Sequence, residues 1–308
     1  MSVFMICFLV LLSALQSLTF ALFQKKYNGN STLATGVFSV LEGIFVPLFT
    51  VIWLMFDINA NASGFSVQYA GLNFNVSFFT LLIAIFNATA LFFYNMFFIK
   101  ASSTGSFAFV NVIMLFGAIL IPTLYSALFN NETVLPHQII GIALMVCSFV
   151  IMNYKDFNFK DTKWVYFLYC FLLFIVNGAY STFLKVQSIF KQSEYNEMIL
   201  LTYAFMGVLA LAKILITEKK DAIRALKINK QAIIPLVAGI FVVAFTTNFF
   251  KFALSLINTA VLYSALNGGV IVLTTIFSIM FFKEKIQTNK IVGIIIAIFS
   301  IILLTISV

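Results

Sequence analysis

Charged residues are scarce in this chain of 308 residues: they make up 9% of it, against about 25% in a soluble globular domain. Hydrophobic residues make up 62% and run in long continuous stretches. So few charges could not cover a water-soluble fold of this size, which excludes the soluble classes. Because the apolar stretches are continuous rather than alternating, a transmembrane β-barrel is excluded too. The composition predicts an integral membrane protein, with the lipid bilayer as its surroundings.

Histidine and cysteine are nearly missing as well. The single histidine, His137, cannot form a His-based triad or a His metal cluster, and no glycine-rich phosphate-binding loop is recognisable. The three cysteines, at positions 7, 147 and 170, lie in apolar stretches without metal-ligand spacing and are interpreted as buried, reduced packing residues. We therefore expect no enzyme, no metal and no cofactor, and any transport energy would come from gradients or exchange.

Ten apolar stretches are long enough to be membrane helices, since one crossing needs about 20 residues. The sequence thus predicts an all-α fold with ten transmembrane helices. They span Ser2–Phe23, Leu33–Phe56, Phe78–Phe98, Thr104–Phe129, Pro136–Met152, Trp164–Leu184, Asn196–Thr217, Ala232–Leu254, Asn258–Phe282 and Ile291–Ser307.

An internal repeat divides these helices into two sets of five. Shifting the chain by 152 residues places Ala101–Asn153 on Ala253–Thr305 without a gap, with 13 of the 53 positions identical. Five helices is an odd number, so the second copy must enter the membrane upside down, as in alternating-access transporters with a central site. We predict inverted five-helix repeats at 1–153 and 164–308 around a central cavity, with 154–163 as the linker. The identical pairs include Ala108/Ala260, Gly117/Gly269, Ser126/Ser278, Glu132/Glu284 and Gly141/Gly293.

The repeat also carries short motifs at the end of each copy. The first has Asn131-Glu132-Thr133 before Gln138-Ile139-Ile140-Gly141, and the second has Lys283-Glu284-Lys285 before Lys290-Ile291-Val292-Gly293. These motifs, within the duplicated pattern, resemble the EamA domain of the drug/metabolite transporter superfamily. The resemblance implies a basket of ten helices around a central cavity. It further implies secondary transport of a small organic metabolite, often by export or exchange.

The basic residues are distributed unevenly along the chain. Fourteen of the 18 Lys and Arg lie in the odd-numbered connections between predicted helices. Basic loops stay in the cytoplasm, so we expect the odd-numbered loops there and both termini outside, in a multi-pass protein of the cell (plasma) membrane. The same bias explains the net charge of +8, which gives no support for a nucleic-acid partner.

Two charged residues inside the predicted helices are candidates for chemistry. Glu42, near the middle of the second span, either binds a cation or a substrate amine, or cycles a proton. The alternative is a structural Glu42 that ties helices together. Lys251, near the end of the eighth span, either anchors an anionic group or partners Glu42, or else only extends towards the membrane surface.

Polar uncharged residues recur in the same helices. Asn87, Tyr94 and Asn95 share one face of the third span, because they are spaced by seven and eight residues. These residues either line a substrate pocket or form hydrogen bonds between packed helices. The other candidates are Gln16, Asn111, Asn177, Asn248, Tyr263 and Asn267.

These features together predict a secondary active transporter, an exporter or exchanger, with a small molecule as substrate. Amino acids and amines are candidate substrates, and a proton gradient or exchange would drive transport. The alternatives are a non-transporting membrane receptor or assembly protein and, with less support, an intramembrane enzyme. Since an inverted pair completes a cavity within one chain, a monomer suffices, and a homodimer is also compatible.

Overall fold

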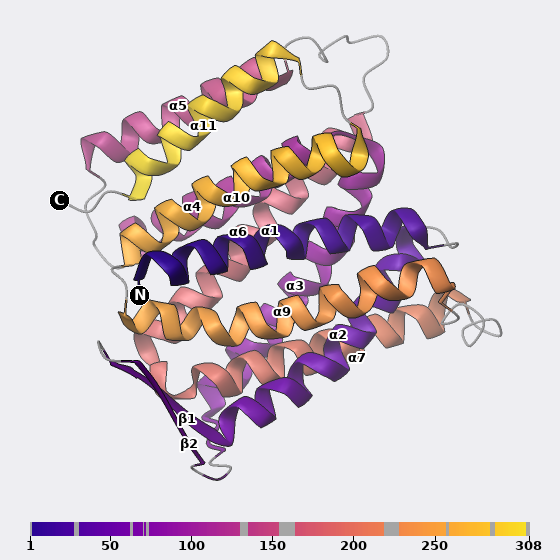
Figure 1. Ribbon diagram of the computed structural model, residues 1–308, viewed down its shortest axis with the longest axis vertical. Helices are drawn as coiled ribbons and strands as arrows, with labels where there is room; N and C mark the ends of the chain where they lie inside the picture. Colours follow the sequence, from indigo (N-terminus) through magenta and orange to yellow (C-terminus); the bar gives the residue numbers. More distant parts are fainter. Residues whose placement is uncertain are drawn as a thin grey trace.

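A computed structural model describes residues 2–27, 31–61, 64–69, 71, 74–129, 135–153, 164–218, 228–256, 259–283 and 287–305. Within these ranges the chain forms ten α-helices of 18 residues or more (Figure 1). They are α1 (Ser2–Lys26), α2 (Ser31–Leu54), α3 (Phe78–Thr104), α4 (Phe107–Phe129), α5 (Pro136–Asn153), α6 (Trp164–Phe190), α7 (Tyr195–Glu218), α9 (Lys230–Leu256), α10 (Thr259–Phe282) and α11 (Thr288–Thr305).

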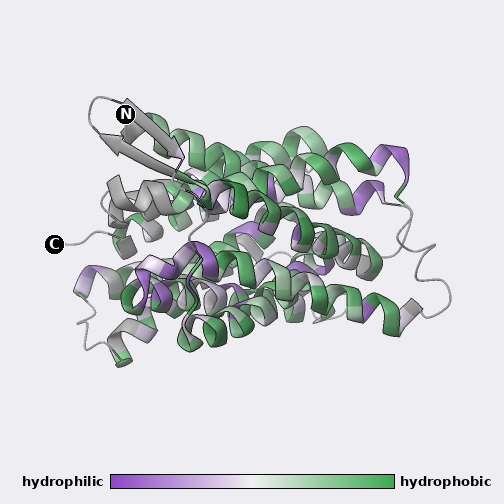
Figure 2. Ribbon diagram, turned by 90° about the horizontal axis from the view of Figure 1, so that it is seen from below, coloured by the Kyte–Doolittle hydropathy of each residue, from purple (hydrophilic) through white to green (hydrophobic). Residues whose placement is uncertain are grey.

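Each predicted span coincides with one of these helices. The largest differences are at Phe98, where α3 continues to Thr104, and at Leu184, where α6 continues to Phe190. Of the described helices, six are both long and apolar enough to cross a membrane. In Figure 2 the helices are hydrophobic over most of their length, and hydrophilic stretches appear both at helix ends and inside the bundle. The chain is therefore a multi-pass membrane protein.

One departure from helix is a β-hairpin between α2 and α3, in the connection between the second and third predicted spans. It consists of β1 (Phe56–Asn61) and β2 (Gly64–Tyr69), which pair antiparallel with Ile58 opposite Val67. Apolar and polar residues alternate along β1, and this period of two fits a strand. In Figure 1 the hairpin lies at the same end of the bundle as the starts of α1 and α3. We call this end the hairpin end and the other the opposite end.

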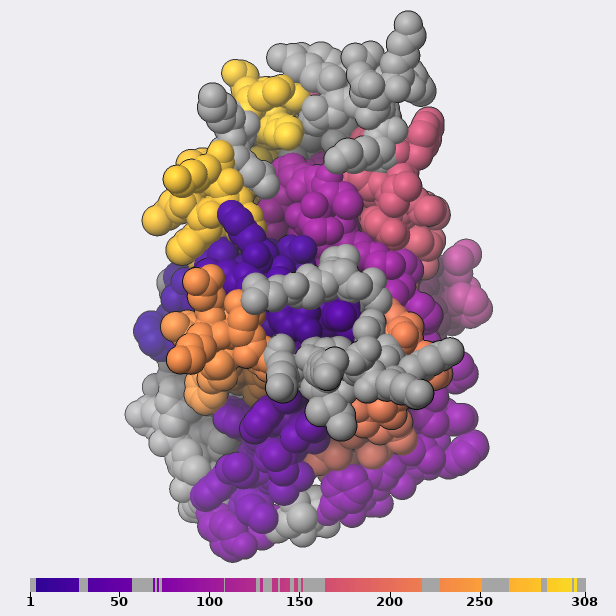
Figure 3. Space-filling view, turned by 90° about the vertical axis from the view of Figure 1, so that its right-hand side faces the viewer, coloured from indigo at the N-terminus to yellow at the C-terminus, as the bar shows by residue number. Residues whose placement is uncertain are grey.

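Helices that are distant in sequence pack side by side. Helix α2 packs on α7, α4 on α10 and α5 on α11. Three further contacts each occur twice when α1, α2, α3 and α4 are matched in chain order with α6, α7, α9 and α10. Helix α3 packs on α6 as α9 packs on α1, α4 packs on α6 as α10 packs on α1, and α3 packs on α7 as α9 packs on α2. Figure 3, which looks onto the opposite end, shows residues from both halves of the chain on that face.

The α5–α11 pair is joined by two reciprocal hydrogen bonds. The Ser148 hydroxyl on α5 donates to the Gly293 carbonyl on α11 at 2.7 Å. The Ser300 hydroxyl on α11 donates to the Gly141 carbonyl on α5 at 2.6 Å. All four residues are buried. Ser148 and Ser300 are 152 positions apart in the sequence, and so are Gly141 and Gly293.

An aromatic cluster fills the interior towards the opposite end. Phe20 of α1 packs edge-on against Phe38 of α2, with ring centroids 4.0 Å apart, and also contacts Phe98 of α3. Phe98 in turn contacts Phe107 of α4, and all four side chains are buried. Cysteine placement differs in part from expectation, because only Cys170 is buried, whereas Cys7 and Cys147 are exposed on the outside of the bundle.

Candidate functional site

Glu42 lies at the middle of α2 and is 2% exposed. Its Oε2 atom accepts a hydrogen bond of 2.8 Å from Asn95 Nδ2 on α3. The same nitrogen donates to the Ser39 hydroxyl, one turn earlier on α2, at 3.0 Å. Among the described side chains, no lysine or arginine forms an ion pair with Glu42. The structure therefore holds a buried carboxyl group whose polar partner is a neutral amide.

A contact between two glycines brings α7 against the Glu42 segment. A Cβ atom on Gly43 would lie 2.3 Å from Gly207 Cα, and one on Gly207 would lie 2.7 Å from Gly43 Cα. Only residues without a side chain allow two helices to approach so closely. Because Gly43 follows Glu42 directly, this contact places the carboxyl group beside α7.

Two tyrosines lie close to Glu42, and a third contacts both of them. Tyr94 of α3 and Tyr203 of α7 both interact electrostatically with Glu42. Tyr180 of α6 forms a hydrogen bond with Tyr203 and interacts with Tyr94. Tyr203 is 2% exposed, and it lies one turn before Gly207. The group formed by Ser39, Glu42, Asn95 and these tyrosines is called the Glu42 cluster below.

The Glu42 cluster has the chemistry to bind an ammonium group or to take up a proton. A carboxylate without a cationic partner is costly inside a membrane protein, so it calls for a ligand cation or a proton. Tyrosine rings add faces that attract cations, and their hydroxyl groups add hydrogen-bond partners. Asn95 can donate to the carboxylate and so hold it in one orientation.

Two more of the predicted site residues meet at Met114 of α4. The Tyr94 hydroxyl donates to the Met114 sulfur at 3.0 Å. Asn177 of α6 donates from Nδ2 to the Met114 carbonyl at 2.7 Å. Tyr94 thus joins the Glu42 cluster to α4. Asn177 lies close to the cluster because it also bonds to Met114.

Asn87 and Asn248 each donate to a threonine on a neighbouring helix. Asn87 Nδ2 of α3 lies 3.5 Å from Thr202 Oγ1 of α7 and 3.6 Å from the Met198 sulfur. Asn248 Nδ2 of α9 donates to Thr50 Oγ1 of α2 at 3.0 Å. Both asparagines are buried, and the Oδ1 atom of each has no partner among the described residues.

The remaining predicted site residues make none of the described hydrogen bonds to the Glu42 cluster. Asn111 donates to the Phe107 carbonyl of its own helix at 2.8 Å. Asn267 on α10 is buried, and Gln16 on α1 is half-buried. Lys251 lies on α9 and Tyr263 on α10, but their side chains fall outside the described residues, and so does the expected Lys251–Glu42 pairing.

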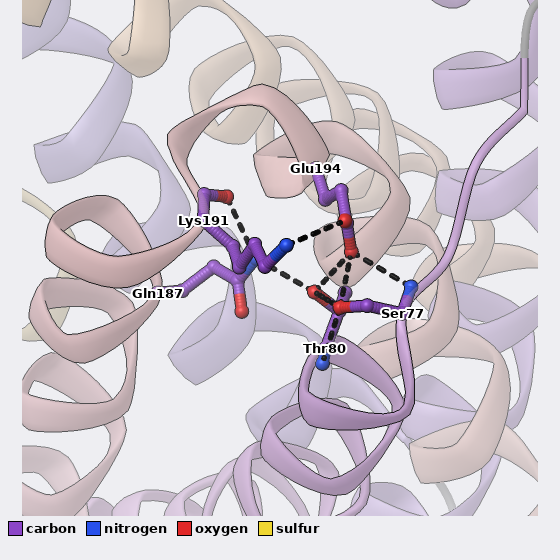
Figure 4. Close-up of polar contacts among 5 residues, drawn as sticks. All are labelled: Ser77, Thr80, Gln187, Lys191 and Glu194. Atoms are coloured by element: carbon purple, nitrogen blue, oxygen red, sulfur yellow. Dashed lines mark hydrogen bonds and ion pairs between the residues drawn. The ribbon is translucent and has the colours of Figure 1, made fainter.

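A second polar cluster, which the sequence analysis missed, lies at the hairpin end (Figure 4). Glu194 belongs to a short 3-10 turn, η1 (Gln192–Glu194), between α6 and α7. Its Oε2 atom accepts hydrogen bonds from the Ser77 backbone N–H at 2.8 Å, the Ser77 hydroxyl at 2.7 Å and the Thr80 hydroxyl at 2.5 Å. Ser77 is the N-cap residue of α3. Glu194 therefore binds α3 at its first turn, where a negative charge is favoured.

Two residues of the α6 end complete this cluster. Gln187 donates from Nε2 to Thr80 Oγ1 at 3.1 Å and to the Lys191 carbonyl at 2.9 Å. The Lys191 ammonium lies 3.8 Å from Glu194 Oε1, but its side chain is 46% exposed. An exposed pair at this distance contributes little, so the hydroxyl and backbone donors hold the carboxylate.

The local sequence shows only part of these arrangements. Ser77 and Thr80 have the spacing of a helix N-cap, and Glu194 precedes an apolar run. Nothing local links Glu194 to Ser77, which lies 117 positions away, or Tyr203 to Glu42. Across the described residues, no group of three or more His, Cys, Asp or Glu side chains could hold a metal ion.

Comparison with known proteins gives one family match. The model of the small multidrug resistance protein family matches residues 220–297, a region that includes α9, α10 and the first half of α11. The search of curated proteins finds no match. Together with the apolar helices, the family match indicates a membrane transporter.

One solved structure, described only as a crystal structure of a protein, has the same fold. Its TM-score is 0.60 with 12% sequence identity, over 95% of this chain and 98% of the other. At this identity the likeness shows the fold alone. It does show that the arrangement of the helices, over nearly the whole chain, occurs in another protein.

Proposed function

We propose that this protein is a secondary active transporter that moves a small organic cation, an amine or an amino acid, by alternating access. The observation that carries the proposal is the buried Glu42 carboxyl group, whose hydrogen-bond partner among the described residues is the neutral amide of Asn95. An ammonium group of the substrate, or a proton, would supply the missing positive charge. The tyrosines of the cluster would contact the substrate through their rings and hydroxyl groups.

Two inverted five-helix repeats, 1–153 and 164–308, would provide the moving parts. The paired helix contacts support this division, because a pseudo-two-fold axis relating α1–α5 to α6, α7, α9, α10 and α11 would produce them. The reciprocal bonds of Ser148 and Ser300 support it as well. These features also agree with the resemblance to EamA-type transporters, in which the substrate would occupy a central cavity between the repeats.

Glu42 is well placed for coupling because it lies where the two halves meet. It belongs to α2 of the first half, and the Gly43–Gly207 contact holds it against α7 of the second half. A movement of one half against the other would therefore change its surroundings. Binding of a proton or an amine at Glu42 would stabilise the arrangements before and after this movement to different degrees. Such a difference is the requirement for coupled transport.

The orientation and the site of action follow from the charge bias. The opposite end of the bundle would face the cytoplasm, because the described helix ends that flank the basic odd-numbered connections, with Lys25, Lys100 and Lys230, lie there. The hairpin end and both termini would face outwards from the cell membrane. A single chain would suffice for transport, and a homodimer is compatible with the fold. No nucleic acid, metal or cofactor is required.

A thermal-stability screen of purified protein tests the proposal. We expect an amine or amino acid in the panel to raise the melting temperature, since a ligand at about 100 times its Kd stabilises by about 2.7 kcal/mol. Glu42→Gln should keep the fold and lose this stabilisation. Glu218→Gln, at the last residue of α7, removes a carboxylate elsewhere and serves as the matched control. The stabilising compound is then tested for flux into proteoliposomes.

Two results would contradict the proposal. An equal thermal shift in wild type and Glu42→Gln would remove Glu42 from the binding site. A ligand that binds through Glu42 but shows no flux in proteoliposomes would identify a membrane receptor instead of a transporter.

A further inference from the structure

Two lysines, Lys100 of α3 and Lys213 of α7, lie close together towards the opposite end of the bundle. The Lys100 ammonium group lies 5.3 Å from the ring centroid of Tyr169 on α6. The Lys213 ammonium group lies 3.1 Å from the Met96 sulfur and 5.4 Å from the ring centroid of Phe92, both on α3. The two positive charges repel each other. We call these two residues the lysine pair, and three helices, α3, α6 and α7, surround it.

The side chain of Lys213 points towards the interior of the membrane. Helices α3 and α7 both run from the hairpin end to the opposite end, and Asn95 of α3 lies beside Met206 of α7. Lys213 follows Met206 by seven residues, so its backbone lies nearer the opposite end by about 10 Å. Its ammonium group nevertheless contacts Met96 and Phe92, which are close neighbours of Asn95 in the sequence. A lysine that only extended to the membrane surface would point the other way.

Neither member of the lysine pair has an acidic partner among the described residues. The ion pair that these residues do contain, between Lys191 and Glu194, lies at the hairpin end. The aromatic rings and the thioether sulfur attract an ammonium group, but they carry no charge that would cancel it. Charged groups inside a membrane are costly unless they are paired. Two ammonium groups placed together at this depth therefore call for an anion.

The lysine pair lies beside an apolar surface on the outside of the bundle. Leu82, Phe86 and Phe93 of α3 are exposed, and they share one side of the helix with Lys100, because the successive spacings are four, seven and seven residues. Asn95, on the opposite side of α3, is buried. The exposed side faces lipid, so a lipid chain can lie along it and run from the lysine pair towards the hairpin end.

We propose that the lysine pair binds the phosphate group of an anionic phospholipid, in the leaflet at the opposite end of the bundle. Phosphate oxygens accept hydrogen bonds from both ammonium groups and cancel their repulsion. One lipid chain lies along the exposed apolar side of α3. Lys100 lies four residues, or about 6 Å, inside the end of α3, which suits the depth of a lipid headgroup. The site does not involve Glu42, so it is independent of the proposed transport function.

Native mass spectrometry of the full-length protein, released from a neutral detergent, tests this site. The probes are dioleoyl phosphatidylglycerol, which is anionic, and dioleoyl phosphatidylcholine, which has the same chains and no net charge. Each lysine near an anionic lipid contributes about fivefold, the factor given by about 1 kcal/mol. We therefore expect the wild type to bind phosphatidylglycerol about 25-fold more tightly than phosphatidylcholine. Lys100→Gln and Lys213→Gln should each reduce this preference about fivefold, and the double variant should abolish it.

Lys25→Gln is the matched control. Lys25 also lies over an aromatic ring at the opposite end, with its ammonium group 5.4 Å from the ring centroid of Phe282. This variant removes the same charge and should leave the preference unchanged. An equal loss in Lys25→Gln would mean that the general positive charge of this end, rather than the lysine pair, attracts the lipid. Lys213→Arg keeps the charge and should keep most of the preference.

Three further results would overturn the proposal. One is equal affinity of the wild type for the two lipids, and another is an unchanged preference in both single variants, which answer the question even if the double variant does not fold. Thermal unfolding without added lipid checks that each variant is folded. The third is binding of glycerophosphoglycerol, the same headgroup without chains, as tightly as phosphatidylglycerol, because the ligand would then be a soluble phosphate compound instead of a lipid.

Discussion

Gly43 of α2 and Gly207 of α7 touch through their backbones at the point where the two halves of the chain meet. A Cβ atom on Gly43 would come within 2.3 Å of Gly207 Cα and 2.9 Å of the Tyr203 carbonyl oxygen. Neither of those atoms belongs to a flexible side chain that could move aside. The position of Glu42 beside Tyr203 of α7 therefore depends on the absence of a side chain at the next residue.

We expect Gly43→Ala to lower the free energy of unfolding by about 1–3 kcal/mol, the usual cost of overpacking. The added methyl group forces α2 and α7 apart. Thermal unfolding in detergent measures the change. Gly268→Ala is the control, because the nearest atom to its added Cβ, Ile298 Cγ2, lies 3.8 Å away. That variant should be neutral or slightly stabilised, since alanine is the better helix former. Equal stability of Gly43→Ala and wild type would mean that the two helices separate at no cost.

The hydrogen bonds of Glu194 should make it important for stability at the hairpin end. Glu194→Ala removes the acceptor of the Ser77 and Thr80 hydroxyls and of the Ser77 N–H. Hydrogen bonds to charged groups contribute about 1.5–3 kcal/mol each, and they are not additive within one network. We expect a loss of stability of about 1.5–3 kcal/mol, measured by thermal unfolding.

Lys191→Ala is the companion variant, because it removes the ion pair and leaves the hydroxyl donors in place. The exposed ammonium group lies 3.8 Å from the carboxylate, so we expect a change below about 0.5 kcal/mol. A large loss in Lys191→Ala together with a small loss in Glu194→Ala would show that the ion pair, rather than the α3 cap, holds this end together.

Much of the secondary structure could be predicted from hydrophobic runs, because a bilayer demands about 20 apolar residues per crossing. Such runs cannot give the pairing of helices or the places where polar residues meet. Glu42 and Asn95 were both identifiable as polar residues in apolar helices, and the structure joins them at 2.8 Å. Asn111 had the same signal, yet it bonds within its own helix.

What the sequence could not predict depends on contacts between distant segments. In the sequence, Tyr203 cannot be distinguished from other aromatic residues of an apolar run. Its place near Glu42 depends on the contact between Gly43 of α2 and Gly207 of α7. In the sequence, Glu194 resembles an ordinary acidic residue of a loop. Its role is visible only from the hydrogen bonds that Ser77 and Thr80, at the start of α3, donate to it. The β-hairpin was predictable only in hindsight, from the alternation in β1, because two short strands carry a weak signal next to long helices.

The proposed orientation gives a labelling prediction. In a background without the three native cysteines, Ser66→Cys in β2 should react with a membrane-impermeant maleimide on intact cells. Ser103→Cys, near the end of α3 at the opposite end, should react only after the cells are permeabilised. The expected difference follows from the basic residues at the opposite end. Labelling of Ser103→Cys alone on intact cells would reverse the orientation.

The two serines of the α5–α11 pair provide a test of the proposed repeat symmetry. Ser148 and Ser300 occupy equivalent positions, and each donates to the carbonyl of the glycine seven positions before the other serine. If the repeats pack about a pseudo-two-fold axis, Ser148→Ala and Ser300→Ala should lower stability equally. Each loss should be about 0.6 kcal/mol, the average for interhelical hydrogen bonds in membrane proteins.

The double variant should lose about the sum of the two, because the bonds share no atoms and connect different residues. Ser188→Ala on α6 is the control, since its hydroxyl donates to the Lys185 carbonyl of the same helix and joins no second helix. Thermal unfolding of all four variants in one detergent gives the comparison. A loss in only one of the two single variants would mean that the bonds are not equivalent, and that the α5–α11 contact does not follow the symmetry of the rest of the bundle.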